Sequence, residues 1–327
     1  LQGKGIKMVK AKTVPLWIPA HSEIVIEGYV NTECGNCGWD PSDGELGEGA
    51  VFEGPFGDHT GYYSMPDRYP VVDVTAVTHR KNAIFPATVV GPPPQEDYYL
   101  GKATERIMLP LLKVMIPDII DYHLPMFGTF HNCLFVKIKP EYKDHARKVM
   151  HGIWGAGQLA WTKILVIVND TVDVHNEREV FDTMTGIDIH NDVEVVRGAL
   201  DILDHASPEI GSGGKLGIDA TNTQPNENAI HIISVKKNKG GDGAVALEKE
   251  HQKNLNCSMI FAVDDGIELD SLGEVFFHFA ACFDPLRDMH YFDNCIGFDG
   301  TTKMEGDQRN GKAVRPWPPK LVLNDGD

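Results

Sequence analysis

Short runs of apolar residues, alternating or continuous, predict β-strands in the N-terminal part of the chain. Within residues 14–30, the segment Glu23-Ile-Val-Ile-Glu27 alternates polar with apolar side chains, as a half-buried strand does. The β-branched run at 69–79 and the apolar run at 83–90 are joined by a polar turn and stop at a glycine followed by three prolines. These runs predict antiparallel strands, in a part without helices that looks like half of a barrel.

An amphipathic helix is predicted between residues 97 and 115. Its apolar side chains recur at helical spacing and are expected to pack in a core: Leu100, Ala103, Ile107, Leu111 and Val114. Pro110 should kink this helix and Pro117 should end it. Because the hydrophobic pattern differs on its two sides, the helix is the predicted link between two domains.

Beyond Pro125 the pattern changes to alternating strands and helices. The all-apolar run at 164–168 is typical of a strand covered on both faces. The other elements expected in this part are strands at 133–139 and 193–196 and helices at 141–154 and 177–184. This alternation predicts an α/β domain with mostly parallel strand pairing.

The last third of the chain repeats part of this domain. Residues 164–173 recur as 259–268, Glu179-Val-Phe181 recurs as Glu274-Val-Phe276, and residues 217–221 recur as 297–301. A repeat of this length predicts a duplicated βαβ unit rather than a solenoid. Glu179 and Glu274 recur in both copies, and we interpret them as solvated positions on helix faces, which is the usual place for glutamate.

The overall charge of the chain is strongly negative. It has 30 lysine and arginine residues against 47 aspartate and glutamate residues, a formal net charge of -17. This balance argues against nucleic acid or an anionic membrane surface as the main partner. The sequence shows no signal-like opening segment and no apolar stretch long enough to span a bilayer, so we expect a cytoplasmic location.

The cysteines also fit the expected cytoplasmic location. The six cysteines are scattered, and only Cys34-Gly-Asn-Cys37 has the spacing of metal ligands or of a redox pair. A structural zinc site normally needs a second pair, which Cys282 and Cys295 could supply. We favour the simpler interpretation, a glycine-rich surface loop with reduced thiols.

The candidate chemistry lies in one segment, Glu53-Gly-Pro-Phe-Gly-Asp-His-Thr-Gly-Tyr-Tyr63. Pro55 fixes φ and Gly54 permits positive φ, so the segment is a shaped loop rather than a regular helix or strand. Two carboxylates held together, Glu53 and Asp58, can have different pKa values and divide the work of proton transfer. The alternative is a solvent-exposed turn, because glycine, proline and aspartate are common turn residues.

This segment, with five others in the same order, resembles the UbiD-like decarboxylases, which remove or add a carboxylate on aromatic or unsaturated acids using prenylated FMN. The other five matching segments are 19–28, 78–84, 162–168, 203–208 and 217–221. The resemblance implies a split β-barrel that holds the flavin. A helix joins that barrel to an α/β domain, which covers the active site and assists oligomerisation.

The resemblance also assigns roles to individual residues. Glu53 matches the first catalytic acid of the family, and Asp58 matches the second, which delivers a proton to the carbon left after CO2 departs. The pocket residues implied in the same way are His59, Tyr98, Leu100, Ile202 and Leu203. Ile202 and Leu203 match a segment that closes over the substrate.

The cofactors implied by the resemblance are prenylated FMN, a divalent metal ion of the Mn2+ type, and K+. The family's partner arginine and its metal ligands would lie upstream of Leu1, so we expect none of those ligands in this chain. The chain therefore looks like a C-terminal fragment that is inactive alone. The implied partners are an aromatic acid substrate, a flavin prenyltransferase that supplies the cofactor, and further copies of the chain; nucleic acid is not expected, and membrane contact only through a lipidic substrate.

The duplicated unit and Asp58 resemble the quinone-biosynthesis branch of the family. They imply non-oxidative decarboxylation of a prenylated or polyprenylated aromatic hydroxy acid in menaquinone or ubiquinone biosynthesis. Three alternatives stay open: an aromatic carboxylase of the same family, a non-catalytic oligomerisation fragment, and a metal or redox protein built on the cysteine pair.

The predicted fold class is accordingly α+β and α/β: an incomplete split β-barrel, a linker helix, and an α/β domain with a duplicated βαβ unit. The predicted domains are residues 1–95 for the C-terminal part of the flavin-binding barrel, 96–122 for the linker helix, 123–225 for the first α/β copy and 226–327 for the second.

Overall fold

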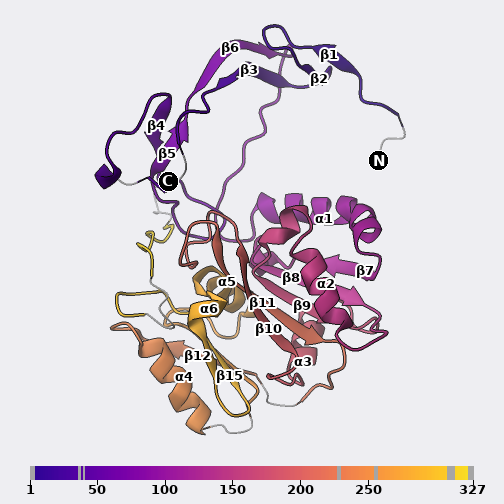
Figure 1. Ribbon diagram of the computed structural model, residues 1–327, viewed down its shortest axis with the longest axis vertical. Coiled ribbons are helices and arrows are strands. Elements are labelled where there is room, and N and C mark those ends of the chain that lie inside the picture. Colours follow the sequence, from indigo (N-terminus) through magenta and orange to yellow (C-terminus); the bar gives the residue numbers. More distant parts are fainter. Residues whose placement is uncertain are drawn as a thin grey trace. The chain divides into compact units, whose positions relative to one another are not determined.

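The structure is a computed structural model that describes residues 4–35, 38–39, 41–226, 230–253, 257–307 and 314–322. The chain divides into two compact units (Figure 1). The first unit comprises residues 1–57 and 63–89, and the second comprises residues 58–62 and 90–327. Among the described residues, no helix combines the length and apolar character needed to cross a bilayer. Cys37 lies outside the described residues, so the expectation for the cysteine pair stays a prediction.

The first unit consists of three antiparallel ladders of two strands each, as far as its described residues show. The paired strands are β1 (Met8–Lys10) with β2 (Trp17–Pro19), β3 (Ile24–Val30) with β6 (Val72–His79), and β4 (Ala50–Glu53) with β5 (Asp67–Pro70). One short 3-10 helix, η1 (Pro41–Asp43), precedes β4. Glu27 is the only buried side chain among the described residues of this unit, so these ladders close no barrel of their own.

The strand predicted at 83–90 does not form. Residues 83–90 have no ladder partner, and Ile84 and Phe85 are more than 70% exposed. An apolar run becomes a strand only when another strand satisfies its backbone groups, and periodicity cannot supply that partner.

Helix α1 (Glu96–Met115) forms close to the predicted bounds and contains Pro110, but its predicted core stripe is wrong. Leu100, Ile107 and Val114 are each more than half exposed. The helix instead buries Gly101, Glu105 and Leu112 against β7 (Ile119–His123) and its surroundings. Its buried face is therefore narrow and includes a carboxylate.

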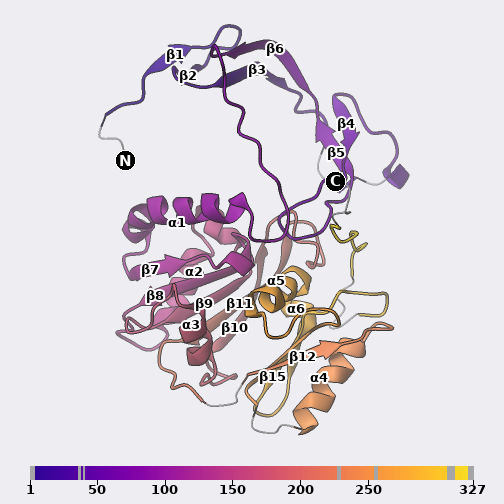
Figure 2. The same ribbon diagram turned by 180° about the vertical axis from the view of Figure 1, so that it is seen from behind.

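The first α/β copy is built on a five-stranded sheet in the order β10-β11-β9-β8-β7 (Figure 2). β9 (Ile164–Val168) pairs in parallel with both β8 (Cys133–Ile138) and β11 (Ser212–Ala220), while β10 (Val193–Ala199) and β7 pair antiparallel at the edges. The helical elements of this copy are η2 (Met126–Gly128), α2 (His145–Ile153), η3 (Gly157–Trp161) and α3 (Glu177–Met184). The predicted alternation and the mostly parallel centre are confirmed.

The second copy has the same strand order on a smaller scale. Its sheet runs β14-β15-β13-β12, with β13 (Met259–Asp264) parallel to β12 (Ile230–Val235) and to β15 (Ile296–Asp299), and β14 (Met289–Tyr291) antiparallel at the edge. Its helices are α4 (Asp242–Lys253), α5 (Leu272–Cys282) and α6 (Pro285–Asp288). The duplicated βαβ unit read from the sequence is therefore present in the fold, and the mixed α+β and α/β class is confirmed.

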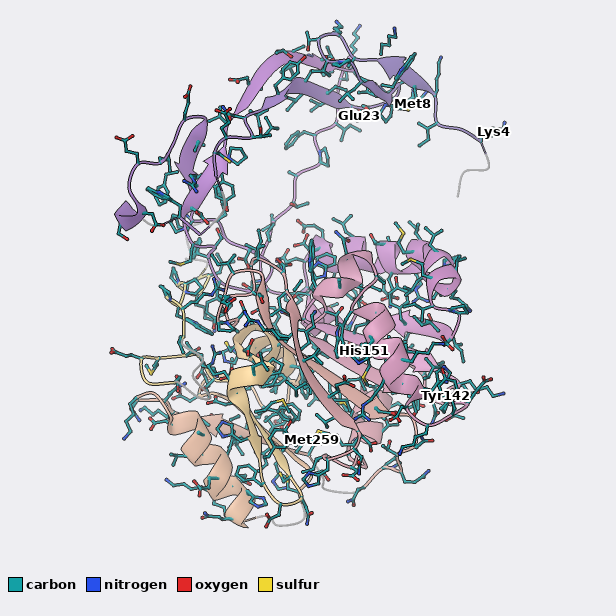
Figure 3. The ribbon with its side chains drawn as sticks, in the orientation of Figure 1. Lys4, Met8, Glu23, Tyr142, His151 and Met259 are labelled. Atoms are coloured by element: carbon teal, nitrogen blue, oxygen red, sulfur yellow. The ribbon has the colours of Figure 1, made fainter. Side chains whose placement is uncertain are left out.

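The two copies share one hydrophobic core. Phe181 on α3 and Phe276 on α5, which occupy equivalent positions of the repeat, stack with ring centroids 4.3 Å apart. Of the residues labelled in Figure 3, Met259 is fully buried, whereas Tyr142 and His151, near α2, are more than half exposed. The second unit thus supplies a rigid scaffold for the loops described next.

Candidate functional site

The predicted catalytic loop starts at the end of β4. Glu53 pairs in register with Asp67 of β5, and its side chain is exposed. Gly54 follows with φ of +108°, and a Cβ there would lie 3.1 Å from the Cα of Pro66, so the chain turns sharply at a position that requires glycine. The loop shape predicted from the sequence is confirmed.

Asp58 lies in a tight turn of the second unit and is buried. Its Oδ1 accepts hydrogen bonds from the backbone N–H of Thr60, at 2.7 Å, and from the Thr60 hydroxyl. The backbone N–H of Asp58 donates to the carbonyl of Tyr62 at 3.1 Å. Glu53 and Asp58 belong to different units, so their convergence on one site stays a prediction.

His59, the next residue, faces the segment predicted to close over the substrate. Its Nε2 lies 3.8 Å from Oδ2 of Asp201, and Nε2 of His131 lies 3.8 Å from the same oxygen. Burial lowers the pKa of His131, and the nearby His59 lowers it further, although Asp201 opposes both. One carboxylate thus bridges two imidazoles that come from sites far apart in the sequence.

The five predicted pocket residues do not all lie in one place. His59 and Tyr98 line the same small cavity, together with Lys102 and Phe130. Leu100 and Ile202 are 57% and 60% exposed, and Leu203 is half-buried with its N–H donating to Oδ1 of Asp201. Within the described second unit, the structure therefore joins His59 to Tyr98 and to Asp201, and leaves Leu100 at the surface.

A larger cleft of about 660 Å³ opens beside the same loop. It is lined by aromatic, acidic and small residues, among them Tyr62, Tyr98, Glu177, Glu274, Phe277, His278 and Lys320. Gly61 borders it with φ of +82°, and a Cβ there would meet the ring of Phe277 at 3.2 Å. Its volume lies in the range of small-molecule sites.

A buried group of polar residues at the wall of this cleft was missed in the sequence. Nε2 of His278 lies 2.9 Å from Oδ2 of Asp264, and the Tyr62 hydroxyl lies 3.4 Å from Sγ of Cys282. Burial alone would raise the pKa of Cys282, but His278 and His205 lower it to about 5. Burial alone would lower the pKa of His278, but Cys282 and Asp264 raise it to about 10. Each residue therefore favours the charged form of the other, a thiolate on Cys282 and an imidazolium on His278.

The sequence did contain one signal for this group. His278 and Cys282 are four residues apart, which places them on the same face of a helix. The third partner, Asp264, ends β13, and no spacing rule connects it to the helix. Likewise, no spacing rule connects Asp204, in the family-like segment 203–208, with Lys163, although the two form an ion pair of 2.6 Å.

The comparisons with known proteins cover nearly the whole chain. Residues 1–93 match the model for the 3-octaprenyl-4-hydroxybenzoate carboxy-lyase Rift-related domain. Residues 98–220 and 225–315 match the model for the 3-octaprenyl-4-hydroxybenzoate carboxy-lyase C-terminal domain. Both matches occur in the expected order.

The relatives are longer proteins. An uncharacterized protein of Archaeoglobus fulgidus is 49% identical over 66% of this chain and 42% of its own length. An uncharacterized protein of Helicobacter pylori is 32% identical over 97% of this chain and 54% of its own length. The chain thus spans about half the length of these relatives.

Two solved structures resemble the fold. The closed form of vanillic acid decarboxylase from Sedimentibacter hydroxybenzoicus superposes with a TM-score of 0.56 at 25% identity, over 76% of this chain and 49% of that one. The UbiD-class enzyme HmfF from Pelotomaculum thermopropionicum, solved with FMN, gives a TM-score of 0.50 at 27% identity, over 68% and 46%. With both of its domains matched, the chain belongs to the UbiD family of carboxy-lyases.

Proposed function

We propose that this chain is the C-terminal part of a decarboxylase that removes CO2 from an aromatic hydroxy acid with the help of prenylated FMN. The observation that carries the proposal is the ordered match to both family domains, over 1–93 and 98–315. It is supported by solved structures of similar fold, a vanillic acid decarboxylase and a UbiD-class enzyme solved with FMN.

The chemistry of the reaction explains why a cofactor is needed. Loss of CO2 from an sp² carbon leaves an unstabilised carbanion, and no protein side chain is an adequate electron sink, so the flavin supplies that function when bound. This chain would supply the proton. Asp58 is the proposed donor, because it matches the family's proton-delivering acid and is buried in an ordered turn, and Glu53 is the proposed second acid.

The described lining of the 660 Å³ cleft does not fit the flavin phosphate. Its cationic side chains are Lys320 and His278, of which His278 is already paired with Asp264, and they are accompanied by the two carboxylates of Glu177 and Glu274. A phosphate site needs converging cations or free backbone N–H groups. We therefore propose that the phosphate, the Mn2+-type ion and K+ are bound by a preceding part of the full protein, and that this chain alone is inactive.

The finer substrate assignment rests on resemblance to the quinone-biosynthesis branch. We propose a polyprenylated dihydroxynaphthoate or 4-hydroxy-3-polyprenylbenzoate type of acid, with membrane contact only through that lipidic substrate. A flavin prenyltransferase would supply the cofactor, and the full protein would act as a homo-oligomer in the cytoplasm. The domain limits at 95, 122 and 225 are part of the same proposal.

The test uses the full-length protein, produced together with a flavin prenyltransferase, and measures CO2 release from a panel of aromatic acids. Asp58→Asn should lower kcat by a factor of about 10²–10⁴, because Asn keeps an oxygen for the Thr60 hydrogen bonds but cannot deliver a proton. Glu53→Gln should do the same. Glu45→Gln, at an exposed acid of the first unit, is the matched control and should leave the rate unchanged.

Full activity of both acid variants would contradict the assigned roles. Absence of CO2 release from every acid, with net fixation of bicarbonate instead, would replace the decarboxylase by a carboxylase of the same family. Activity of the 327-residue chain by itself would contradict the proposed dependence on a preceding part.

A further inference from the structure

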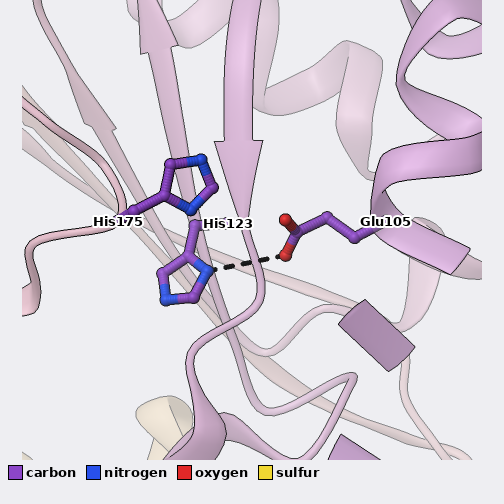
Figure 4. Close-up of side chains that lie close together, drawn as sticks. All are labelled: Glu105, His123 and His175. Atoms are coloured by element: carbon purple, nitrogen blue, oxygen red, sulfur yellow. Dashed lines mark ion pairs between the residues drawn. The ribbon is translucent and has the colours of Figure 1, made fainter. Parts of the chain in front are cut away.

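A second cluster of chemically active residues lies on the other side of α1 from the exposed stripe. It consists of Glu105 from α1, His123 from the end of β7 and His175 from the loop before α3 (Figure 4). Glu105 and His123 are buried, whereas His175 is exposed. One donor atom from each residue lies within 4.8 Å of the other two. The proposed decarboxylase reaction does not use these residues.

A carboxylate stands beside the outer nitrogen of each imidazole ring, and in His175 the two are hydrogen-bonded. Nε2 of His123 lies 3.7 Å from Oε1 of Glu177, and Nε2 of His175 lies 3.1 Å from Oδ2 of Asp121. Metal-binding histidines usually donate their outer N–H to a carboxylate, as the contact of His175 with Asp121 allows, which fixes the ring and leaves the other nitrogen for the ion. Here the nitrogen left over is Nδ1 in both rings.

A cation already occupies the space between the three donors. Nζ of Lys102 lies 2.7 Å from Nδ1 of His123, 3.1 Å from Nδ1 of His175 and 2.8 Å from Oε1 of Glu105. Three electron-pair donors therefore converge on one ammonium group, and Oε1 of Glu105 also lies 2.7 Å from the guanidinium of Arg106. The Lys102 side chain is 28% exposed, so it has a path out to solvent.

The spacing of the donors suits a small transition metal ion. Oε2 of Glu105 and Nδ1 of His123 are 3.5 Å apart. Bonds of about 2.0–2.1 Å in a tetrahedral zinc site place neighbouring ligand atoms roughly 3.3 Å apart. Two imidazoles and one carboxylate match Zn2+ better than Mg2+ or Ca2+, which prefer oxygen ligands alone.

We propose that Glu105, His123 and His175 form a binding site for a divalent transition metal ion, best matched by Zn2+, in which the ion displaces the ammonium group of Lys102. Three protein ligands leave a fourth position open for water or for a small ligand. The family resemblance implies metal ligands outside residues 1–327, so the site proposed here would be additional to them. It does not depend on the proposed decarboxylase activity.

Isothermal titration of the 327-residue chain with ZnCl2 at pH 8 tests the proposal. The wild-type chain should bind one equivalent. Lys102→Met removes the competing ammonium and should tighten binding by roughly tenfold or more. His175→Ala removes one ligand from an exposed loop, where folding is not at risk, and should weaken binding by about 100-fold or more. His190→Ala, at an exposed histidine outside the cluster, is the matched control and should bind like the wild type.

Cobalt provides a second measurement that surface binding would not reproduce. Co2+ added to the Lys102→Met chain should give the visible absorption of a low-symmetry site, and His175→Ala should abolish that absorption. Equal zinc affinity of wild type, Lys102→Met and His175→Ala would overturn the proposal. Binding by Lys102→Met but not by wild type would overturn it for the native chain, because Lys102 would then be the permanent cation.

Discussion

The two α/β copies have the same strand order but place different chemistry on it. In the first copy, β9 ends at Val168 and is followed by Asn169; in the second, β13 ends at the equivalent position with Asp264. Asn169 donates to the carbonyl of Thr221 at 3.1 Å, a neutral hydrogen bond. Asp264 accepts from Thr302 and forms an ion pair with His278. A neutral connection in one copy is therefore a charged network in the other.

The helix after each strand differs in the same sense. Thr183 follows Glu179 by four residues, as His278 follows Glu274, and its hydroxyl donates to the carbonyl of Val180 on its own helix. His278 instead reaches Asp264 and faces Cys282. The duplicated scaffold therefore accommodates both arrangements, and the strand order that the two copies share does not require the charged group.

The largest effect on stability is expected from substitutions in the hydrophobic core that the two copies share. These substitutions test whether both copies contribute equally to that core. Phe276 is 5% exposed and contacts the rings of Phe181, Phe127 and Phe261, while Phe181 is only partly buried. Phe276→Ala should lower the free energy of unfolding by about 3–5 kcal/mol, and Phe181→Ala by less, because the cavity it leaves is partly open. Urea denaturation followed by circular dichroism measures both. Equal losses would show that the two equivalent positions are equally buried in solution.

The next effect concerns the charged network itself. Asp264→Asn gives the second copy the residue of the first and leaves the imidazolium of His278 without its carboxylate. Removing one partner of a largely buried pair should cost roughly 2–4 kcal/mol of unfolding free energy. Glu274→Gln, at an exposed acid on the same helix, is the control and should change stability by less than about 0.5 kcal/mol. If the Asp264→Asn chain is as stable as the wild type, the ion pair between Asp264 and His278 makes no net contribution to the free energy of unfolding.

Much of this scaffold could be predicted from the sequence, for identifiable reasons. β9 and α3 were predicted to the residue. A continuous apolar run marks a strand covered on both faces, and in the structure Asn176 caps α3 by accepting from the N–H of Glu179, a local signal that fixes where the helix begins. The helix predicted from 141 begins only at His145, because Asp144 adopts φ of +62° immediately before it. Local sequence signals therefore predicted whether an element is a helix or a strand better than they predicted its first and last residues.

The candidate sites were predictable only in part. The loop around Asp58 has a strong local pattern, and resemblance to a family singled it out. The Asp264 network and the Glu105 cluster depend instead on residues that approach each other through tertiary packing, such as Glu105 and His175. The prediction that the apolar stripe of α1 packs in a core was wrong for a different reason. Periodicity identifies an apolar stripe, but it does not show whether another surface covers that stripe.

A smaller effect should appear in the pH dependence of stability. The folded pKa of His278, about 10, exceeds its ordinary value, so its contribution is complete below about pH 6.5 and is lost as the pH rises through about 10. The folded pKa of Cys282, about 5, is below its ordinary value, so its contribution is complete above about pH 8.5–9 and is lost as the pH falls through about 5.

Together these shifts predict a plateau of stability between about pH 6.5 and 8.5, with a decrease on either side. Between pH 5 and 6.5, the wild-type free energy of unfolding should rise with pH more steeply than that of Cys282→Ser, by about one proton, or roughly 1.4 kcal/mol per pH unit. Urea denaturation at several pH values measures the two slopes. Cys257→Ser, at a buried cysteine of a different cluster, is the control for loss of a thiol. Parallel slopes for wild type and Cys282→Ser would contradict the thiolate assignment.

The smallest effect comes from the reverse exchange in the first copy. Asn169→Asp keeps the oxygen that accepts from the N–H of Thr171 but loses the donor to the carbonyl of Thr221. No histidine stands at the position of Thr183 to balance the new charge, so we expect a loss of about 1 kcal/mol in the unfolding free energy. Asn169→Asp combined with Thr183→His should recover part of that loss if the scaffold alone determines the geometry of the pair. If the double variant is less stable than the sum of the single changes predicts, the three additional residues of α5 are needed to position the imidazole.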